Sequence, residues 1–351
     1  PPVAPSADII GRLGFDPLTV GSEHEAKIGG LGLPAGFTYK DVVSPGTYDD
    51  IDVIALDPTE RYLFFAMQLQ YPDGSVYRVD LATGDVMRLT SGLHRPGGIA
   101  YYQSGNVLLV AEEGTGAGPQ ERQLGFYRAV KPDVPDQPTP PPLRAMGQYR
   151  GKGIEIISAD TIYLGEDQPN GGPIYKYVLD SPPALATGAL YVFKENQGWI
   201  ETAILEAPDT GKEGTNFYAG EDMHVGPDGR LYFVLSARAE TRVVAVSLTT
   251  ASVTNFVTAT TPYANIRPTF DKPDQLAFAP NGTLFITAGG DVWAALPDGP
   301  DEDTLSDGVY RFLTGLGSAQ GIWMTRDGGT FYVAARGQED AILAISGLKF
   351  Q

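Results

Sequence analysis

Residues 276–290 read LAFAPNGTLFITAGG, and the fold can be predicted from this segment and its repeats. A short apolar segment, a turn rich in Pro, Asn and Gly, and a second apolar segment form the pattern of a β-hairpin. The same frame recurs along the chain, which indicates a repeat architecture. The other copies are MHVGPDGRLYFVLSA (223–237), IWMTRDGGTFYVAAR (322–336), IAYYQSGNVLLVAEE (99–113), IEIISADTIYLGED (154–167) and the degenerate IALDPTERYLFFAM (54–67).

Each copy is followed by another stretch in which apolar and polar residues alternate, as in a strand with one covered face. A unit of three or four strands that recurs six times predicts an all-β fold, a six-bladed β-propeller. Helical repeats are excluded because the units lack a period of 3.6 residues, and a β-sandwich would not explain six copies of one hairpin.

We expect the whole chain, 1–351, to be a single propeller domain. Residues 1–48 form a lead segment, in which 33–43 is expected to add an outer strand to the last blade and close the ring. Residues 131–143, KPDVPDQPTPPPL, are predicted to be a Pro-rich surface connector, and the acidic loop 297–307 is expected to be solvated.

The composition limits the partners and the compartment. The chain has a formal net charge of −18 and no cysteine. An acidic surface repels nucleic acid and anionic membranes, and without cysteine there is no disulfide and no thiolate metal site. No apolar run approaches the roughly 18 residues of a membrane span.

Two features favour an exported protein in the periplasm, the extracellular space or the thylakoid lumen. The chain has no cysteine, and its opening PPVAPSADII resembles a terminus left after removal of a signal peptide. The same opening also fits a chain cut from a longer sequence.

The repeat allows equivalent positions of the six frames to be compared. The start of the innermost strand, which in a propeller faces the central channel, lies two residues before the first apolar residue of each frame. These positions hold Asp52, Gly97, Lys152, Glu221, Asp274 and Gln320. The ends of the second strands add two acidic pairs and one cation, namely Glu112 with Glu113, Glu166 with Asp167, and Arg336. We therefore predict that carboxylates from several blades converge at the mouth of the channel.

Converging carboxylates need a partner, because two like charges 4 Å apart repel by about 4 kcal/mol at an effective dielectric constant near 20. The cluster must share protons, pair with Lys152 or Arg336, or bind a cation. Among cations, oxygen ligands favour Ca²⁺ over Mg²⁺ or Mn²⁺, and zinc is disfavoured because only three histidines are present, of which His224 is interpreted as structural. A plainer interpretation is that these Asp and Glu residues cap turns at strand ends.

The run AMGQYRGKGIEIISADTIYLGEDQPNGGPIYKYV (145–178) resembles a motif series of the PhoX-type bacterial alkaline phosphatases. The segment LLVAEEGTG (108–116) is similar to the acidic segment of that family. Further segments follow in the family's order: LATGALYVFKENQGWIE, KPDQLAFAPNGTLFI and AQGIWMTRDGGTFYVAA, with LPAGFTYKDVVSPG resembling the opening stretch. The resemblance therefore spans most of the chain.

This resemblance implies a propeller exported from the cytoplasm, a cluster of calcium and iron at the channel mouth, and hydrolysis of phosphate esters. By position it assigns metal binding to Glu112 or Glu113, Glu166 or Asp167, Glu221 and Asp274. The chain departs from the family at Ala111, which replaces the iron-binding Cys, and at Lys152, which replaces a Glu. The iron site is therefore expected to be lost. Lys152 is expected either to pair with Glu166 as a surrogate cation or to contact a phosphate, as Arg336 could.

Two functions from different classes remain open. The first is a Ca²⁺-dependent hydrolase of small phosphate esters, or of related esters or lactones, in which Lys152 or Arg336 stabilises the developing anion. The second is a non-catalytic propeller that serves a protein partner as an interaction or structural subunit. A third option, binding of a sugar or another small ligand, needs aromatic residues at the mouth, and the sequence does not place Trp199, Trp293 or Trp323 there.

Overall fold

All six predicted hairpin frames form neighbouring strands in the computed structural model. The structure describes residues 7–18, 30–114, 125–168, 171–203, 214–236, 241–258, 261, 272–299, 301, 303–337 and 340–347. Within these residues the strands form six sheets of three to five strands each. The protein is an all-β six-bladed β-propeller, as the repeat predicted.

The chain divides into two units. Unit 1 comprises Pro1–Ile51, Gly226–Val246 and Val253–Gln351, and unit 2 comprises Asp52–Val225 and Ser247–Ser252.

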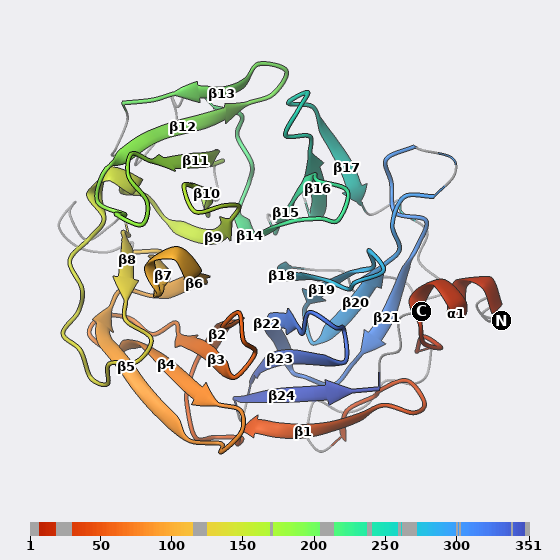
Figure 1. Ribbon diagram of the computed structural model, residues 1–351. Coiled ribbons are helices and arrows are strands. Elements are labelled where there is room, and N and C mark those ends of the chain that lie inside the picture. Colours follow the sequence, from red (N-terminus) through yellow and green to blue (C-terminus); the bar gives the residue numbers. More distant parts are fainter. Residues whose placement is uncertain are drawn as a thin grey trace. The chain divides into compact units, whose positions relative to one another are not determined.

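Unit 2 holds the sheets that carry most of the predicted site residues. Figure 1 labels the strands of these sheets. The first sheet has the order β2-β3-β4-β5, with β2 Ile51–Leu56, β3 Tyr62–Met67, β4 Gly74–Asp80 and β5 Val86–Leu93. The second has the order β6-β7-β8, with β6 Pro96–Tyr102, β7 Val107–Glu112 and β8 Tyr127–Val130. The third has the order β13-β12-β11-β10-β9, with β9 Gly151–Ile156, β10 Thr161–Glu166, β11 Ile174–Leu179, β12 Gly188–Lys194 and β13 Gly198–Glu201. The remaining elements of this unit are β14 Gly220–Val225, η2 Gln103–Gly105 and η4 Arg144–Met146.

Unit 1 begins with a short helix, α1 Ala7–Leu13, and the strand β1 Thr38–Val43. The sheet that β14 begins continues with β15 Leu231–Leu235, β16 Arg242–Val246 and β17 Val253–Val257. The next sheet contains β18 Pro273–Phe278, β19 Leu284–Ala288, β20 Asp291–Ala295 and β21 Val309–Leu313. The last has the order β1-β24-β23-β22, with β22 Ser318–Met324, β23 Thr330–Arg336 and β24 Ala341–Ser346.

The N-terminal strand β1 is the outer strand of this last sheet. It pairs antiparallel with β24, in a register that places Thr38 opposite Ser346 and Lys40 opposite Ala344. In Figure 1, β1 runs alongside β24. This is the pairing expected of the segment 33–43, and it joins residues from the two ends of the chain in one sheet.

Side chains close the turns of the hairpins, which explains the Asp and Asn residues in the repeated frame. Asp228 accepts the backbone N–H of Arg230 at 3.0 Å, and Asn281 accepts that of Thr283 at 3.1 Å. Gly282, next to Asn281, has a φ of 87°, which glycine adopts without strain. Asp228 and Asn281 therefore act as turn formers.

Each unit has its own hydrophobic core. In unit 2, buried side chains from the strands β6 to β12 and from the segment before β9 form one cluster, which includes Tyr102, Tyr127, Tyr149 and Tyr177. In unit 1, one cluster gathers around Phe285, Phe312 and Phe331 and a second around Trp293. The Pro-rich segment 131–143 is mostly exposed. No helix in the described part of the chain is long and apolar enough to cross a membrane.

Candidate functional site

Four strands of unit 2 begin near the residues compared across the frames, and two others, β7 and β10, end near predicted site residues. In an antiparallel hairpin, the start of the first strand and the end of the second strand lie at the same edge of the sheet. The register places Pro96 at the start of β6 opposite Glu112 at the end of β7, and Gly151 at the start of β9 opposite Glu166 at the end of β10. The charged groups at these strand ends can therefore meet.

Lys152, on β9, lies among carboxylates from different strands. Its Nζ is 2.5 Å from Glu221 Oε2 on β14, 4.0 Å from Asp52 Oδ2 on β2 and 4.0 Å from Glu113 Oε1, just after β7. The Lys152 side chain is only 7% exposed. Of the three outcomes predicted for converging carboxylates, the structure shows pairing with Lys152.

Glu113 is contacted by an amide and two guanidinium groups in addition to Lys152. Gln68 Nε2 donates to its Oε1, while Arg95 Nη2 and Arg150 Nη2 lie 3.2 and 3.4 Å from its Oε2. Burial raises the pKa of the Glu113 carboxyl above its ordinary value, although Lys152 opposes this shift. With both oxygens already engaged, Glu113 acts as an anchor for the surrounding cations.

Arg150 joins Glu113 to a second carboxylate. Its Nη2 is 3.0 Å from Asp167 Oδ2, just after β10. Burial lowers the pKa of Arg150, but Asp167 and Glu113 outweigh this effect and the net shift is upward. The side chains of Arg150 and Arg95 are 29% and 35% exposed. The Nε atoms of both are buried and make no hydrogen bond to any described residue.

We name these residues the Lys152 cluster. It contains four carboxylates, three cations and one amide, namely Asp52, Glu113, Asp167, Glu221, Lys152, Arg95, Arg150 and Gln68. One negative charge is therefore in excess when all groups are ionised.

The two acidic pairs are split by the fold. Glu113 and Asp167 belong to the Lys152 cluster, whereas Glu112 and Glu166 are held by other groups. Glu112 accepts from Arg128 Nε at 2.7 Å and from the backbone N–H of His94 at 2.8 Å. Burial raises the pKa of Glu112, and Arg128 opposes this.

Glu166 is fully buried and accepts the hydroxyl of Tyr175 at 3.0 Å. Tyr149 stacks on Tyr175 with ring centroids 4.4 Å apart, and burial raises the pKa of both phenols. We expected Lys152 to pair with Glu166, but the close partner of its ammonium group is Glu221.

Two predicted residues belong to unit 1. Asp274 lies on β18 and is partly buried. Arg336 ends β23 and forms an ion pair with Asp50, through its Nη2. Their predicted metal-binding and catalytic roles stay predictions.

Arg95, Arg150 and Gln68 were not among the residues predicted for the site. A signal was present, because both arginines stand four residues before the first apolar residue of their frames, Ile99 and Ile154. His224, interpreted as structural, lies between two carboxylates: Nδ1 is 3.1 Å from Glu155 Oε2 and Nε2 is 3.5 Å from Asp222 Oδ2.

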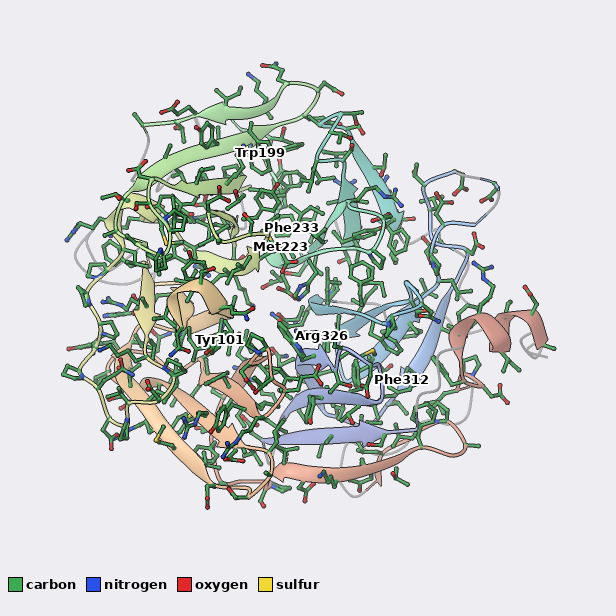
Figure 2. The ribbon with its side chains drawn as sticks, in the orientation of Figure 1. Tyr101, Trp199, Met223, Phe233, Phe312 and Arg326 are labelled. Atoms are coloured by element: carbon green, nitrogen blue, oxygen red, sulfur yellow. The ribbon has the colours of Figure 1, made fainter. Side chains whose placement is uncertain are left out.

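Two of the three tryptophans pack within sheets. Trp199, labelled in Figure 2, stacks on Tyr163 with ring centroids 5.0 Å apart and an angle of 9° between the rings. Trp293 is fully buried, with the guanidinium of Arg311 5.1 Å from its ring. Trp199 and Trp293 are therefore packed against other side chains, which weakens the case for a sugar site built on these tryptophans.

The calcium and iron implied by the resemblance do not fit the Lys152 cluster. A calcium ion needs six to eight oxygen ligands, but the Lys152 ammonium lies where the carboxylates converge. Ala111, at the position expected for the iron-binding Cys, is fully buried in the hydrophobic cluster of unit 2. A different group could hold a metal ion: Asp298, Asp301 and Asp303, in the predicted acidic loop, each offer an oxygen within 4.8 Å of the others.

No protein-family model matches the sequence, and no curated protein matches it. Solved structures with the same fold do match over most of the chain. A gluconolactonase from Xanthomonas campestris is 13% identical, with a TM-score of 0.58, over 99% of this chain and 94% of that chain. A luciferin-regenerating enzyme is 10% identical, with a TM-score of 0.54, over 89% of this chain and 96% of that chain. A PQQ-bound aldose sugar dehydrogenase from Streptomyces coelicolor is 16% identical, with a TM-score of 0.51, over 90% of this chain and 99% of that chain.

At these identities the likeness establishes the fold alone. The chain is a six-bladed β-propeller similar to these enzymes, and the comparisons give the PhoX-type resemblance no support.

Proposed function

We propose that the protein is a hydrolase of small phosphate esters or of related esters and lactones, with its active site at the Lys152 cluster. One observation carries this proposal. Arg95 and Arg150 are anchored by the same oxygen of Glu113, keep buried Nε groups without a hydrogen-bond partner among the described residues, and are about one-third exposed. Two guanidinium groups fixed in this way are suited to bind a phosphate or carboxylate, whose oxygens accept their N–H groups.

The carboxylates of the cluster supply a base. Glu221 and Asp167 have side chains that are 13% and 12% exposed, whereas Asp52 and Glu113 are almost fully buried. A water molecule beside Glu221 or Asp167 would give up its proton to the carboxylate while its oxygen attacks the phosphorus or carbonyl carbon of the ester. The bond from that atom to the alcohol oxygen then breaks, and the protonated carboxyl returns its proton to the departing alkoxide. Arg95 and Arg150 would stabilise the charge that develops on the substrate.

Phosphate esters are the first substrate class to test, because the sequence resembles a phosphatase family. Lactones and carboxylic esters are the second, because a solved structure with this fold is named a gluconolactonase. Lys152 supplies positive charge in the cluster, so the proposal does not place calcium there. If the chain binds calcium, we propose the triad Asp298, Asp301 and Asp303 as the site.

The test uses p-nitrophenyl phosphate, p-nitrophenyl acetate and glucono-δ-lactone, each with EDTA and with Ca²⁺. We expect hydrolysis of at least one of them in EDTA, and a loss in kcat/KM of about a hundredfold in Arg95→Gln and Arg150→Gln. Arg88→Gln is the matched control, because Arg88 forms an exposed ion pair with Asp136 at 2.7 Å in the same unit. Absence of hydrolysis of all three compounds, or equal activity in the variants, would refute the proposal.

A second function, a non-catalytic propeller that serves a protein partner, is favoured by one observation. The cations and carboxylates of the Lys152 cluster pair with one another, as the 2.5 Å contact between Lys152 and Glu221 illustrates. A chain that binds inorganic phosphate through Arg150 but hydrolyses none of the three compounds would support this function.

With either function we propose an exported protein, which fractionation of the source cells would test.

A further inference from the structure

A stacked pair of aromatic rings lies next to Arg95 in the chain. The rings belong to Tyr71, between β3 and β4, and to His94, between β5 and β6; their centroids are 4.4 Å apart, with an angle of 8° between the rings. We infer that this pair binds an aromatic ring of the substrate, and that the preferred substrates are phosphate monoesters that carry such a ring. The inference rests on the proposed function for the position of the phosphate, beside Arg95 and Arg150, but its test does not require hydrolysis.

Exposure distinguishes this pair from the other stacked rings of unit 2. Tyr71 is 51% exposed, the highest value among the large hydrophobic residues that the structure describes, and the next, Ile157, is 40% exposed. The stacked rings of Tyr149 and Tyr175, by contrast, are buried. An exposed tyrosine whose ring is already held in a stack offers apolar area and a π-face to the ring of a ligand.

Two contacts hold the ring pair and the Arg95 guanidinium on the same two segments of the chain. Arg95 Nη2 donates to Gln68 Oε1 at 3.3 Å, and three residues after Gln68 the ring of Tyr71 stacks on His94. His94 and Arg95 are consecutive, so their Cα atoms are about 3.8 Å apart. A small ligand can therefore reach both the aromatic rings and the guanidinium, whose side chain is 35% exposed.

Backbone hydrogen bonds join these two segments on both sides of Tyr71. The N–H of Arg95 donates to the carbonyl oxygen of Leu69 at 3.1 Å. The N–H of Gly92 donates to the carbonyl oxygen of Pro72, also at 3.1 Å. Because the ring pair is already positioned in the free protein, binding a ligand there costs little conformational entropy.

The backbone of Arg95 has an uncommon conformation. Its φ is 48°, in the left-handed region that residues other than glycine seldom adopt. Such conformations cost free energy and are concentrated at functional sites. The same conformation interrupts the alternation of an extended strand, so the side chains of His94 and Arg95 are not forced to opposite sides of the chain.

The experiment measures ligand binding by isothermal titration calorimetry on the full chain. The ligands are phosphonates, which are not hydrolysed because a CH₂ group replaces the ester oxygen. Benzylphosphonate carries a single ring, the methylenephosphonate analogue of adenosine monophosphate carries a nucleobase, and butylphosphonate carries no ring. We expect at least one of the two aromatic ligands to bind about tenfold more tightly than butylphosphonate, since stacking on an aromatic side chain contributes on this order.

Four variants separate the ring contact from the phosphate contact. Tyr71→Leu keeps an apolar side chain without a ring and is expected to abolish the preference for aromatic ligands while leaving the affinity for butylphosphonate unchanged. Tyr71→Phe keeps the ring and is expected to bind as the wild type does. Arg95→Gln is expected to weaken binding of all three ligands by about tenfold or more, because it removes a charged hydrogen-bond donor. Tyr39→Ala is the control for loss of an exposed tyrosine, since Tyr39 is 38% exposed on β1 of unit 1, and it is expected to change none of the affinities.

The outcomes distinguish this inference from the proposed function. Equal binding of aromatic and aliphatic phosphonates by the wild type would overturn the inference and leave the proposed function intact. A preference for aromatic ligands that survives in Tyr71→Leu would also overturn it. Binding that prefers an aromatic ligand and depends on Tyr71, in a chain that hydrolyses no ester, would uphold the inference and reject only the hydrolytic function. A wild type that binds none of the three ligands would reject both the inference and the phosphate site.

Discussion

His224 should make the stability of the protein depend on pH above neutrality. Both ring nitrogens face carboxylates, at 3.1 Å for Glu155 and 3.5 Å for Asp222, and the side chain is 19% exposed. Burial lowers the pKa of His224, but Asp222 and Glu155 outweigh this effect and raise it to about 9 from the ordinary 6.5. A difference of about 2.5 units at 1.36 kcal/mol each corresponds to about 3 kcal/mol of the free energy of unfolding.

The sign follows from the direction of this shift. Because the pKa is higher in the folded state than in the unfolded state, the stabilisation is complete below about pH 6.5 and is lost as the pH rises through about 9. We therefore expect the difference in unfolding free energy between the wild type and His224→Gln to shrink by about 3 kcal/mol between pH 6.5 and 9.5. Urea denaturation monitored by tryptophan fluorescence measures this difference at each pH.

Nuclear magnetic resonance gives an independent check of the same prediction. The chain contains only three histidines, so the signal that disappears in His224→Gln is readily assigned. Its ring protons are expected to titrate near pH 9. Titration of this signal near pH 6.5, or a stability difference that is the same at all pH values, would refute the reasoning.

Two further predictions concern packing and charge in the folded state. Arg128→Met leaves the buried Glu112 carboxylate without its guanidinium partner and is expected to lower the free energy of unfolding by about 3–5 kcal/mol. The loss is measured as a shift of the urea midpoint, and an unchanged midpoint would contradict the ion pair. Gly98→Ala places a Cβ atom 1.7 Å from the carbonyl oxygen of Lys152 and is expected to destabilise the folded protein by about 3 kcal/mol or more. Gly11→Ala is the control, because a Cβ atom at this position in α1 meets nothing within 4 Å. It is expected to stabilise the protein by up to about 1 kcal/mol. Equal effects of the two glycine substitutions in thermal unfolding would show that β6 and β9 are not packed as closely as the structure has them.

Comparison of the repeated frames predicted part of the candidate site. Aligning the frames selected Asp52, Lys152 and Glu221 as equivalent residues at the start of innermost strands, and the structure brings these three together. Their position at one edge of the sheets follows from the antiparallel hairpin, which the sequence specifies through its turn residues and apolar alternation.

The alignment could not decide which member of each acidic pair joins the cluster. Successive residues of a strand point to opposite faces, so a shift of one residue exchanges them. The register of β6 with β7 shifts between Pro96 and Gly98, and that of β9 with β10 shifts between Leu164 and Glu166. Bulges at these strand ends are set by packing between sheets and have no signature in the frame itself.

The all-β fold, the six hairpins and the charged groups at the strand ends could be predicted from the sequence, because they depend on local alternation and turn chemistry. Which of these charges meet depends on the packing of the strands in space. Lys152 pairs with Glu221 because strands from different sheets approach closely at the glycines around it. Glu112 and Glu166 instead face Arg128 and Tyr175. Ion pairing over a few ångströms depends on distances between segments far apart in the chain, and only the packing of the sheets fixes those distances.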